Sequence, residues 1–363
     1  MKARVRGALA VVTAAATAVV LAACSEDGAT DSAGGNQLKI GVLLPDSITA
    51  RWETRDRQQL DREIKDRCPE CTVQHANAKN EVAIQQAQMN SMIAEGVDAI
   101  LLVAVDATSM RPTVEKADEA GVPVIAYDRL AEGPISAYAS FDGEEVGRLQ
   151  GSALLKAMSE RTPDANRIVM MNGDPTDPNA VSFQKGAMSV LEGKVDIAKE
   201  YETRQWRPDV AHMNMSGAIS ALGAGNIDGV YAANDGLAAG SIAALKANKV
   251  APLPPITGQD AELGALRRIV AGEQYMTVYK PFAPEAAAGA ALAVAAARGE
   301  DLDRVAEDTV RTESGHTVPA VLLTPVAVTA DTIEDTVVKD GLFTARQICT
   351  PQLAADCESA GLT

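Results

Sequence analysis

Short runs of β-branched and other apolar residues alternate with longer amphipathic stretches along most of the chain. The first run, residues 38–44, predicts a strand that leads from the edge of a sheet into its core. Residues 81–95 place apolar side chains at helical spacing, and Gly96 predicts the helix end. Further strand-like runs lie at residues 99–104, 122–127, 167–171, 229–233 and 275–279. The segments between them are long enough for crossover helices, which predicts parallel sheets.

The N-terminal segment has the pattern of an export signal. Lys2, Arg4 and Arg6 precede a short apolar run, residues 8–23, that is rich in small residues. The run ends in Leu-Ala-Ala followed by Cys24, which resembles the lipobox of bacterial lipoproteins. We therefore expect residues 1–24 to form a lipoprotein signal with Cys24 as the lipidated residue, the alternative being an ordinary cleaved signal. Residues 25–37 are small and polar, which favours a flexible tether.

Length and charge narrow the classes of protein that fit. About 325 residues follow the tether, more than one hydrophobic core usually supports, which predicts two lobes. The net charge of -16 disfavours a nucleic-acid partner, and 47% hydrophobic residues exclude bulk disorder. No apolar stretch after the signal is long enough to span a bilayer.

Four further cysteines fall in two local pairs, Cys68 with Cys71 and Cys349 with Cys357. An exported chain reaches compartments where disulfides persist, so two short-loop disulfides are the simplest interpretation. A four-thiolate zinc site is an alternative, although the second pair lacks the usual ligand spacing. A redox role for the first pair is disfavoured because it follows a charged helical stretch instead of opening a helix.

Polar side chains gather in the loops that follow the predicted strands, where ligands bind in open parallel sheets. Carboxylates accept hydrogen bonds, Arg and Lys donate them and Asn does both, so such a set can satisfy the hydroxyls of a sugar. Opposite charges would keep one another ionised around an uncharged ligand. The residues in these loops are Arg51, Trp52, Asp128, Arg129, Asp177, Asn179, Asn234, Asp235, Gln259, Asp260 and Lys280.

Trp52 and Trp206 are the two tryptophans of the chain, and each lies beside an arginine. Aromatic faces pack against the C–H patches of sugars, although a plain core role is the alternative for both. Asp235 follows Asn234 at a helix start and has capping as its alternative role. Asp260 carries the same alternative.

Enzymatic readings find little support in the sequence. The sequence contains no Walker P-loop. The glycine cluster at residues 223–225 precedes a predicted strand, whereas the glycine-rich loop of a phosphate site follows a strand. The three histidines lack a nucleophile pattern around them. A glycosidase using two of Asp128, Asp177, Asp235 and Asp260 is the enzyme alternative. We expect no enzyme activity, no cofactor and no metal.

The chain resembles the ribose/galactose group of periplasmic binding proteins, and within it the bacterial D-xylose binders. The motifs are KIGVLLPDSITARW, NSMIAEGVDAILLVA, PVIAYDRL, SFDGEEVG, DPTDPNA, AANDG, TGQDAEL and MTVYKP, in family order between Leu38 and Leu342. The resemblance implies the type I fold, two doubly wound parallel-sheet lobes joined by a three-segment hinge. It implies an N-terminal lobe of residues 38–141 and 280–320 and a C-terminal lobe of residues 142–279 and 321–363. The cysteine pairs and the extension after Leu342 lie outside the resemblance.

The resemblance also implies a function and a binding site. It implies a monomeric solute-binding protein that delivers a monosaccharide, first D-xylose, to an ABC permease. Together with the lipobox at Cys24, it predicts a lipoprotein on the extracytoplasmic face of the cell membrane. Glucose, arabinose or another aldose, and a role as a sugar sensor, are alternatives. A transcription regulator of the same fold is a further alternative, but it would need an N-terminal helix-turn-helix, and this chain has a predicted lipoprotein signal there instead. The implied ligand-binding residues are Arg51, Trp52, Asp128, Arg129, Asp177, Asn179, Trp206, Asn234, Asp260 and, at a hinge, Lys280.

Two positions depart from the family motifs. Gly143 stands where the xylose binders have Asn, and Pro178 replaces the first Asn of the family's DNNA. Neither departure removes an implied ligand contact. We expect both to act on hinge stiffness or loop shape.

Overall fold

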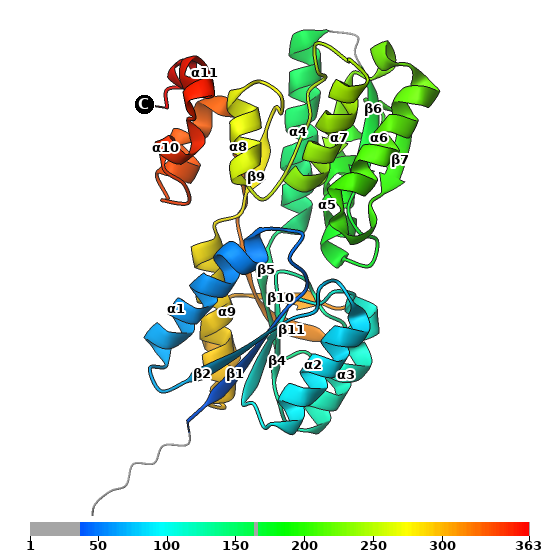
Figure 1. The fold of residues 1–363 in the computed structure, drawn as a ribbon. Coiled ribbons are helices and arrows are strands. Elements are labelled where there is room, and N and C mark those ends of the chain that lie inside the picture. Colours follow the sequence, from blue (N-terminus) through cyan, green and yellow to red (C-terminus); the bar gives the residue numbers. More distant parts are fainter. Residues whose placement is uncertain (1–36, 163–165, 363) are drawn as a thin grey trace, which may run out of the picture. The chain divides into compact units, whose positions relative to one another are not determined.

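The computed structural model describes residues 37–162 and 166–362. The described residues do not include the predicted signal, which ends at Cys24, or the part of the tether before residue 37. Within the described residues the strands form sheets of seven, three and two strands, and helices flank them (Figure 1). The expected α/β fold with two parallel-sheet lobes is confirmed.

The first lobe is built on the seven-stranded sheet, whose strand order is β10-β11-β5-β4-β3-β1-β2. All pairings are parallel except that of β10 with β11. The strands are β1 (Lys39–Leu44), β2 (Thr72–Asn77), β3 (Ala99–Leu102), β4 (Val124–Tyr127), β5 (Ala137–Phe141), β10 (Asp308–Arg311) and β11 (Thr317–Leu323). The expected edge position of the first strand is wrong, because β1 lies between β3 and β2 and β2 forms the edge.

Both faces of this sheet are covered by helices, which explains its continuous apolar runs. Ile40, Val42 and Leu44 of β1 pack with one set of helices, and Leu43 packs with the other. The first set is α1 (Arg57–Arg67) and α9 (Phe282–Ala297), and the second is α2 (Val82–Ala94) and α3 (Ala107–Glu119) (Figure 1). Two short helical segments complete the lobe, the π-helical turn η1 (Trp52–Asp56) and η4 (Leu302–Arg304).

The second lobe contains the three-stranded parallel sheet in the order β7-β6-β8 and the antiparallel pair β12-β9. Its strands are β6 (Arg167–Asn172), β7 (Asp196–Glu202), β8 (Gly229–Ala232), β9 (Thr277–Tyr279) and β12 (Val326–Val328). Its helices are α4 (Gly143–Arg161), α5 (Pro178–Leu191), α6 (Pro208–Leu222), α7 (Asp235–Ala247) and α8 (Leu263–Val270), with the short η2 (Arg204–Trp206) and η3 (Ala224–Asn226).

Helices α4 and α5 approach each other at backbone distance. A Cβ on Gly147 of α4 would lie 1.9 Å from the carbonyl oxygen of Phe183, and one on Gly186 of α5 would lie 2.0 Å from that of Glu144. Only glycine permits this approach, and the approach fixes α5, whose N-terminal end belongs to the candidate site. Gly143 and Pro178, expected to act on the hinge or on a loop, are the first residues of α4 and α5.

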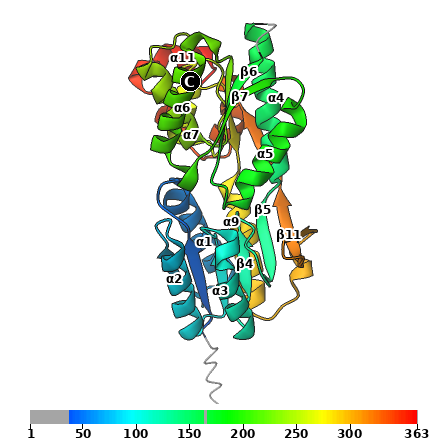
Figure 2. The ribbon, with the colours of Figure 1, turned by 90° about the vertical axis from the view of Figure 1, so that its right-hand side faces the viewer.

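The chain crosses between the two lobes three times. It leaves the seven-stranded sheet after β5, returns through Lys280 and Pro281 into α9, and leaves again after β11, which runs beside β5 (Figure 2). The expected three-segment hinge is confirmed. Lys280 lies on the second crossing.

Beyond β12 the chain forms a C-terminal module, which we define as residues 330–362. It consists of η5 (Ala330–Thr332), the π-helical η6 (Glu334–Val338), α10 (Ala345–Ile348), η7 (Pro351–Leu353) and α11 (Ala354–Ser359). The module packs against α8, and the disulfide between Cys349 and Cys357 closes it. A second disulfide joins Cys68 and Cys71 after α1, so both expected pairings are present.

Candidate functional site

The ten residues predicted to bind ligand lie around one pocket between the two lobes. Those of the first lobe come from η1 and from the loop after β4, and those of the second come from the starts of α5 and α7, the η2 turn and the segments flanking β9. The pocket is small, with about 280 Å³ of space free of protein atoms, part of which is open to solvent. Its lining comprises Thr49, Arg51, Trp52, Asp128, Arg129, Asp177, Asn179, Phe183, Trp206, Asn234, Gln259, Asp260 and Lys280.

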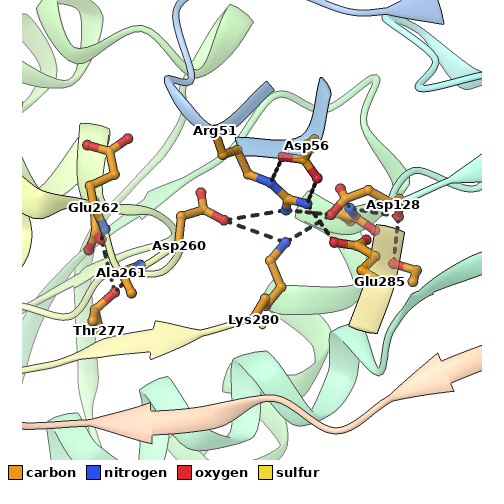
Figure 3. Close-up of polar contacts among 12 residues, drawn as sticks. Arg51, Asp56, Asp128, Asp260, Ala261, Glu262, Thr277, Lys280 and Glu285 are labelled. Atoms are coloured by element: carbon orange, nitrogen blue, oxygen red, sulfur yellow. Dashed lines mark hydrogen bonds and ion pairs between the residues drawn. The ribbon is translucent and has the colours of Figure 1, made fainter. Parts of the chain in front are cut away.

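Arg51 is held from behind by two carboxylates. Its Nε and Nη2 atoms donate to the two oxygens of Asp56 at 2.8 and 2.7 Å, and Nη2 also donates to Glu285 Oε2 at 2.6 Å. The hydroxyl of Tyr127 donates to Asp56 at 2.8 Å. The remaining nitrogen, Nη1, reaches Asp128 at 2.7 Å (Figure 3). The guanidinium is thus fixed by bonds that leave it no freedom to swing out of the pocket wall.

Lys280 and Asp128 join the hinge to the first lobe. Lys280 Nζ donates to Asp128 Oδ2 at 3.1 Å and lies 3.6 Å from Asp260 Oδ1, toward which it reaches in Figure 3. Burial alone would raise the pKa of Asp128, but the charges of Lys280, Arg51 and Arg129 outweigh it and hold that pKa well below its usual range. Asp128 is therefore a permanent anion at the centre of the site.

Arg129 and Asp177 form an ion pair between the lobes. Arg129 Nε lies 2.7 Å from Asp177 Oδ2, and Trp206 Nε1 donates to the same oxygen at 3.0 Å. Across the same boundary, Asn179 Nδ2 donates to Asp128 Oδ1 at 2.8 Å. Burial raises the pKa of Asp177, and Arg129 opposes that rise. These contacts tie the start of α5 to the loop after β4.

The two tryptophans are fixed by different neighbours. The Trp52 ring lies under the guanidinium of Arg51, 4.4 Å from its centroid, with Arg129 at 5.6 Å. Trp206 meets the Phe183 ring edge-on, with centroids 6.4 Å apart, and covers Gly173 so closely that a Cβ there would lie 2.1 Å from the indole. Both rings are preorganised walls of the pocket.

Three of the predicted residues adopt a backbone conformation that is rare outside glycine. The φ angles are 59° for Asp128, 52° for Trp206 and 97° for Asp260. Each such conformation costs on the order of 1–3 kcal/mol and persists where the surrounding structure enforces it. Their coincidence at one pocket indicates a functional site.

Buried polar atoms at the pocket lack partners among the described residues. Trp52 Nε1, Gln259 Oε1 and Asp260 Oδ1 accept or donate no hydrogen bond there, although Asp260 Oδ1 lies within ion-pair distance of Arg51 and Lys280. An unmade hydrogen bond at a buried group costs about 1–3 kcal/mol. A polar ligand in the pocket would supply the missing partners.

The charges of the site suit an uncharged ligand. Three cations, Arg51, Arg129 and Lys280, stand against five buried carboxylates, which are those of Asp56, Asp128, Asp177, Asp260 and Glu285. Burial raises the pKa of Asp177, Asp260 and Glu285, and nearby cations oppose that rise in each of them. A further ionic group would disturb a nearly compensated cluster.

Two predicted residues also have a capping function. Asn234 Oδ1 accepts from the backbone nitrogen of Leu237 at 2.9 Å and caps α7, and Asp177 caps α5 through Asn179. The alternative role of Asp235 as the cap of α7 is wrong. Asp235 is buried behind the pocket and accepts from Gln274 Nε2 at 2.8 Å and Thr277 Oγ1 at 3.0 Å.

Three hydrogen bonds from backbone nitrogens help to hold the loop that carries Asp260. Asp260 N donates to Val278 O at 2.9 Å, Ala261 N donates to Thr277 Oγ1 at 3.2 Å, and Glu262 N donates to Asp235 Oδ2 at 2.9 Å. Figure 3 shows Ala261 and Glu262 beside Thr277. The alternative role of Asp260 as a helix cap is not realised, because Glu262 stands at the N-cap of α8.

Glu262 predicts a pH dependence of stability. Burial, and then the charge of Asp260, raise the pKa of its carboxyl from 4.5 to about 7. Between these values the folded chain keeps a proton that the unfolded chain has released, so the stability from this group falls as the pH rises through the window. We expect Glu262→Gln to raise the free energy of unfolding by about 1–3 kcal/mol at pH 8 and to change it little at pH 4.5.

Urea unfolding at both pH values measures this difference. Glu300→Gln, at an exposed position after α9, is the matched control and should behave as the wild-type chain does at either pH. An equal effect of Glu262→Gln at the two pH values would contradict the assignment.

Sequence reasoning missed several residues of the site. Thr49 and Phe183 line the pocket, Gln259 was recognised only as a loop residue, and Asp56 and Glu285 hold Arg51. Phe183 lies one helical turn after Asn179 on α5 and reads as an ordinary core residue. Glu285 had a usable signal, because it is the one charged residue within the apolar helix α9.

The described residues contain neither a group of side chains that could bind a metal ion nor a helix that could span a membrane. Within residues 37–162 and 166–362, no three histidine, cysteine, aspartate or glutamate side chains are placed to hold a metal ion. No helix in these same ranges combines the length and apolarity needed to cross a membrane.

The fold and the pocket define a two-lobed solute-binding protein, and comparison with known proteins agrees. Residues 40–301 match the family model described as "Periplasmic binding protein domain". The D-xylose-binding periplasmic protein of Escherichia coli is 35% identical over 316 residues, covering 85% of this chain and 92% of the relative. That of Haemophilus influenzae is 34% identical, covering 88% and 94%. This chain belongs to the periplasmic binding protein family.

Solved structures place it further within that family. An ABC transporter solute-binding protein from Clostridium phytofermentans with bound β-D-glucose superposes with a TM-score of 0.78. It is 28% identical, and the match covers 86% of this chain and 100% of that one. The fold is that of the type I sugar-binding proteins of ABC transporters.

Proposed function

We propose that this chain is the extracytoplasmic receptor of an ABC sugar importer and binds one monosaccharide, D-xylose first, in the pocket between its lobes. The observation that carries the proposal is the convergence of three cations, buried carboxylates, amides and two indoles from both lobes on one small pocket. A monosaccharide presents donors and acceptors on every side and carries no charge, and this is the chemistry that the pocket complements.

D-xylose is preferred to other aldoses on the strength of the relatives. The two relatives reported above, which are 35% and 34% identical, are named for D-xylose, and each match covers more than nine-tenths of the relative. The solved relative at 28% identity holds β-D-glucose, which makes glucose the first alternative. A pentose and a hexose differ by one hydroxymethyl group, so a single pocket side chain can decide between them.

The ion pairs of the site support a binding role over glycoside hydrolysis. A glycosidase needs one protonated carboxyl beside the scissile bond and a second carboxylate opposite it. Here Asp128 is held ionised between Arg51 and Lys280. The carboxylate of Asp235 accepts hydrogen bonds from Gln274 and Thr277, so its oxygens are already occupied. Release of the chromophore from an aryl xyloside by the purified chain would contradict this part of the proposal.

Ligand binding in this arrangement couples to the relative position of the lobes. Arg51, Asp128 and Arg129 belong to one lobe and Asp177, Asn179 and Trp206 to the other, so a sugar that contacts both sets favours the arrangement in which they meet. We propose that the permease recognises this arrangement. A radius of gyration that stays the same on addition of saturating D-xylose would argue against the coupling.

We also propose that Cys24 carries a lipid that anchors a monomeric receptor to the outer face of the cell membrane. The support is the sequence before Cys24, a charged start and a short apolar run ending in Leu-Ala-Ala. Replacement of Cys24 by serine should move the chain from the membrane fraction to the soluble fraction. Retention of that variant in the membrane would contradict the anchor.

Calorimetric titration of the purified chain, starting at Ser25, against a panel of pentoses and hexoses tests the proposed function. We expect one site per chain, the lowest dissociation constant for D-xylose, and weaker binding of D-glucose and L-arabinose. Binding of a hexose alone would contradict the preference for D-xylose but would still support a monosaccharide-binding protein. No heat with any aldose would contradict the proposal.

Trp206 gives a second test at the same site. Trp206→Ala removes an indole that is 7% exposed and should weaken sugar binding by roughly 1–3 kcal/mol through lost aromatic burial. Trp206→Phe keeps a ring beside Phe183 and removes the hydrogen bond to Asp177, so an intermediate loss is expected. Titration of both variants measures the effect, and unchanged affinity of Trp206→Ala would remove the indole from the site.

A further inference from the structure

The C-terminal module, residues 330–362, lies after the part of the chain that matches the family model, residues 40–301. Its side chains nevertheless join a buried cluster with the loop that carries Asp260. Ala261, next to Asp260, is 1% exposed and shares this cluster with Ile348, Cys357 and Leu362 of the module. Arg267 of α8 also donates from Nη2 to the carbonyl oxygen of Gln347 at 2.6 Å.

The loop that carries Asp260 needs contacts with other parts of the chain to keep its backbone conformation. Asp260 and Ala261 are consecutive residues with positive φ angles, 97° and 48°, and neither is a glycine. Two such residues in sequence relax unless packing and hydrogen bonds fix them. The methyl group of Ala261 is buried in the cluster to which the module contributes side chains.

The same module reaches the opposite lobe. The guanidinium of Arg55 in η1 lies over the Phe343 ring, 4.7 Å from its centroid. The η1 turn begins directly after Arg51 with Trp52, and both line the sugar pocket. Phe343, Arg55, Ala261 and Phe282 together line a second cavity that adjoins the pocket at Arg51 and Asp260. One C-terminal segment thus contacts the binding turn of the first lobe and shares a buried cluster with the binding loop of the second.

From this placement we propose that the C-terminal module is a positioning element of the sugar site, and that Phe343 is a positioning residue that holds the lobes together around the ligand. The proposal rests on the proposed function of the pocket. Phe343 contacts no sugar, since it does not line the pocket. Its contact with Arg55 exists only while the two lobes are close, so it stabilises the ligand-loaded arrangement and slows its opening.

The kinetics of D-xylose release test the proposal. The chain has two tryptophans, and both line the pocket, so stopped-flow tryptophan fluorescence reports on the site. Removing a partly exposed cation–π contact should raise koff for D-xylose about two- to fivefold. We expect this rise in Phe343→Ala and in Arg55→Gln, with kon and the urea midpoint of the sugar-free chain unchanged. Phe343→Tyr keeps the ring and should restore the wild-type koff.

A double-mutant cycle separates a direct contact from general packing. The variant with both Phe343→Ala and Arg55→Gln should release D-xylose no faster than either single variant, because the two side chains act through one contact. Met213→Ala is the matched control, since Met213 is 62% exposed on α6 and lies outside both cavities. An unchanged koff in Phe343→Ala, or additive effects in the double variant, would overturn the proposal.

Hydrogen exchange without sugar gives a readout that does not depend on the proposed function. Phe343→Ala should speed exchange of the amides at residues 260–262, in the lobe against which the module packs, and should leave η1 unchanged, because the Arg55 contact is absent when the lobes part. Met213→Ala should change neither segment. A wild-type chain that binds no aldose contradicts the function, while exchange in these segments still decides the role of the module. Identical exchange in Phe343→Ala and wild type would overturn that role even if D-xylose binds.

Discussion

Replacing Arg129 with alanine is expected to weaken sugar binding by about 2–5 kcal/mol, the largest loss of affinity that we anticipate from one side chain. Arg129 pairs with Asp177 across the lobes at 2.7 Å and donates to the carbonyl oxygen of Ala104 at 3.1 Å. Without it, Asp177 becomes a buried carboxylate whose closest cation is gone, and burial already raises the pKa of that group. The ligand also loses a charged donor.

A second substitution separates the two losses. Asp177→Asn added to Arg129→Ala removes the stranded charge and should recover folding stability without recovering affinity. Calorimetric titration and urea unfolding of both variants measure the two quantities. Arg148→Ala, in an exposed charge cluster on α4, is the control and should change each by at most about 0.5 kcal/mol. Normal affinity of Arg129→Ala would show that the site is misplaced.

Replacing Arg51 with methionine is expected to lower the free energy of unfolding by about 3–5 kcal/mol. The guanidinium is 4% exposed and compensates Asp56, Asp128 and Glu285 at once, so its loss leaves buried carboxylates without a cation. Burial raises the pKa of Glu285 even with Arg51 present. Urea unfolding at neutral pH measures the effect.

The control and the rescue for Arg51 use residues of the same region. Arg57→Met removes an exposed partner of Glu53 one helical turn away and should change the free energy of unfolding by less than about 1 kcal/mol. Adding Glu285→Gln to Arg51→Met should recover part of the lost stability, because it removes one stranded charge. Equal stability of Arg51→Met and wild type would contradict the role of the cluster.

The fold was predictable because its signals are local. The apolar run at residues 38–44 and the helical spacing at residues 81–95 became β1 and α2 with boundaries shifted by one residue. The gathering of the candidate residues around one pocket was predictable because strands in a parallel sheet end at one edge, so polar residues after several strands meet there. Asp128 after β4 and Asn234 after β8 follow this rule.

Other features depend on tertiary structure that no local pattern encodes. Asp56 stands in a charged helical stretch and looks like a surface residue, yet it is fully buried because Arg51 folds back onto it. Asp128 and Asp260 have positive φ angles although neither is a glycine, so the residue type did not predict this backbone conformation. The place of the first strand inside its sheet follows from the pairing of β2, whose side chains alternate weakly.

In the proposed site, the arrangement of charge would let a cluster of ionic side chains select a ligand without charge. Arg51, Asp128 and Lys280 already bond one another, so the ligand does not have to supply a counterion. Their remaining hydrogen-bonding capacity, with the unpaired atoms of Trp52 and Gln259, is free to replace water around hydroxyl groups. Affinity then depends on geometric fit to a polyol, and selectivity among aldoses depends on the walls of the pocket.

A crystal structure of the chain grown with D-xylose tests this account most directly. The account predicts one sugar in the pocket, its hydroxyls within hydrogen-bonding distance of Asp128 and Arg129 from one lobe and Asn179 from the other, with the ring against an indole. A sugar bound at any other surface, or contacting the side chains of one lobe alone, would contradict it.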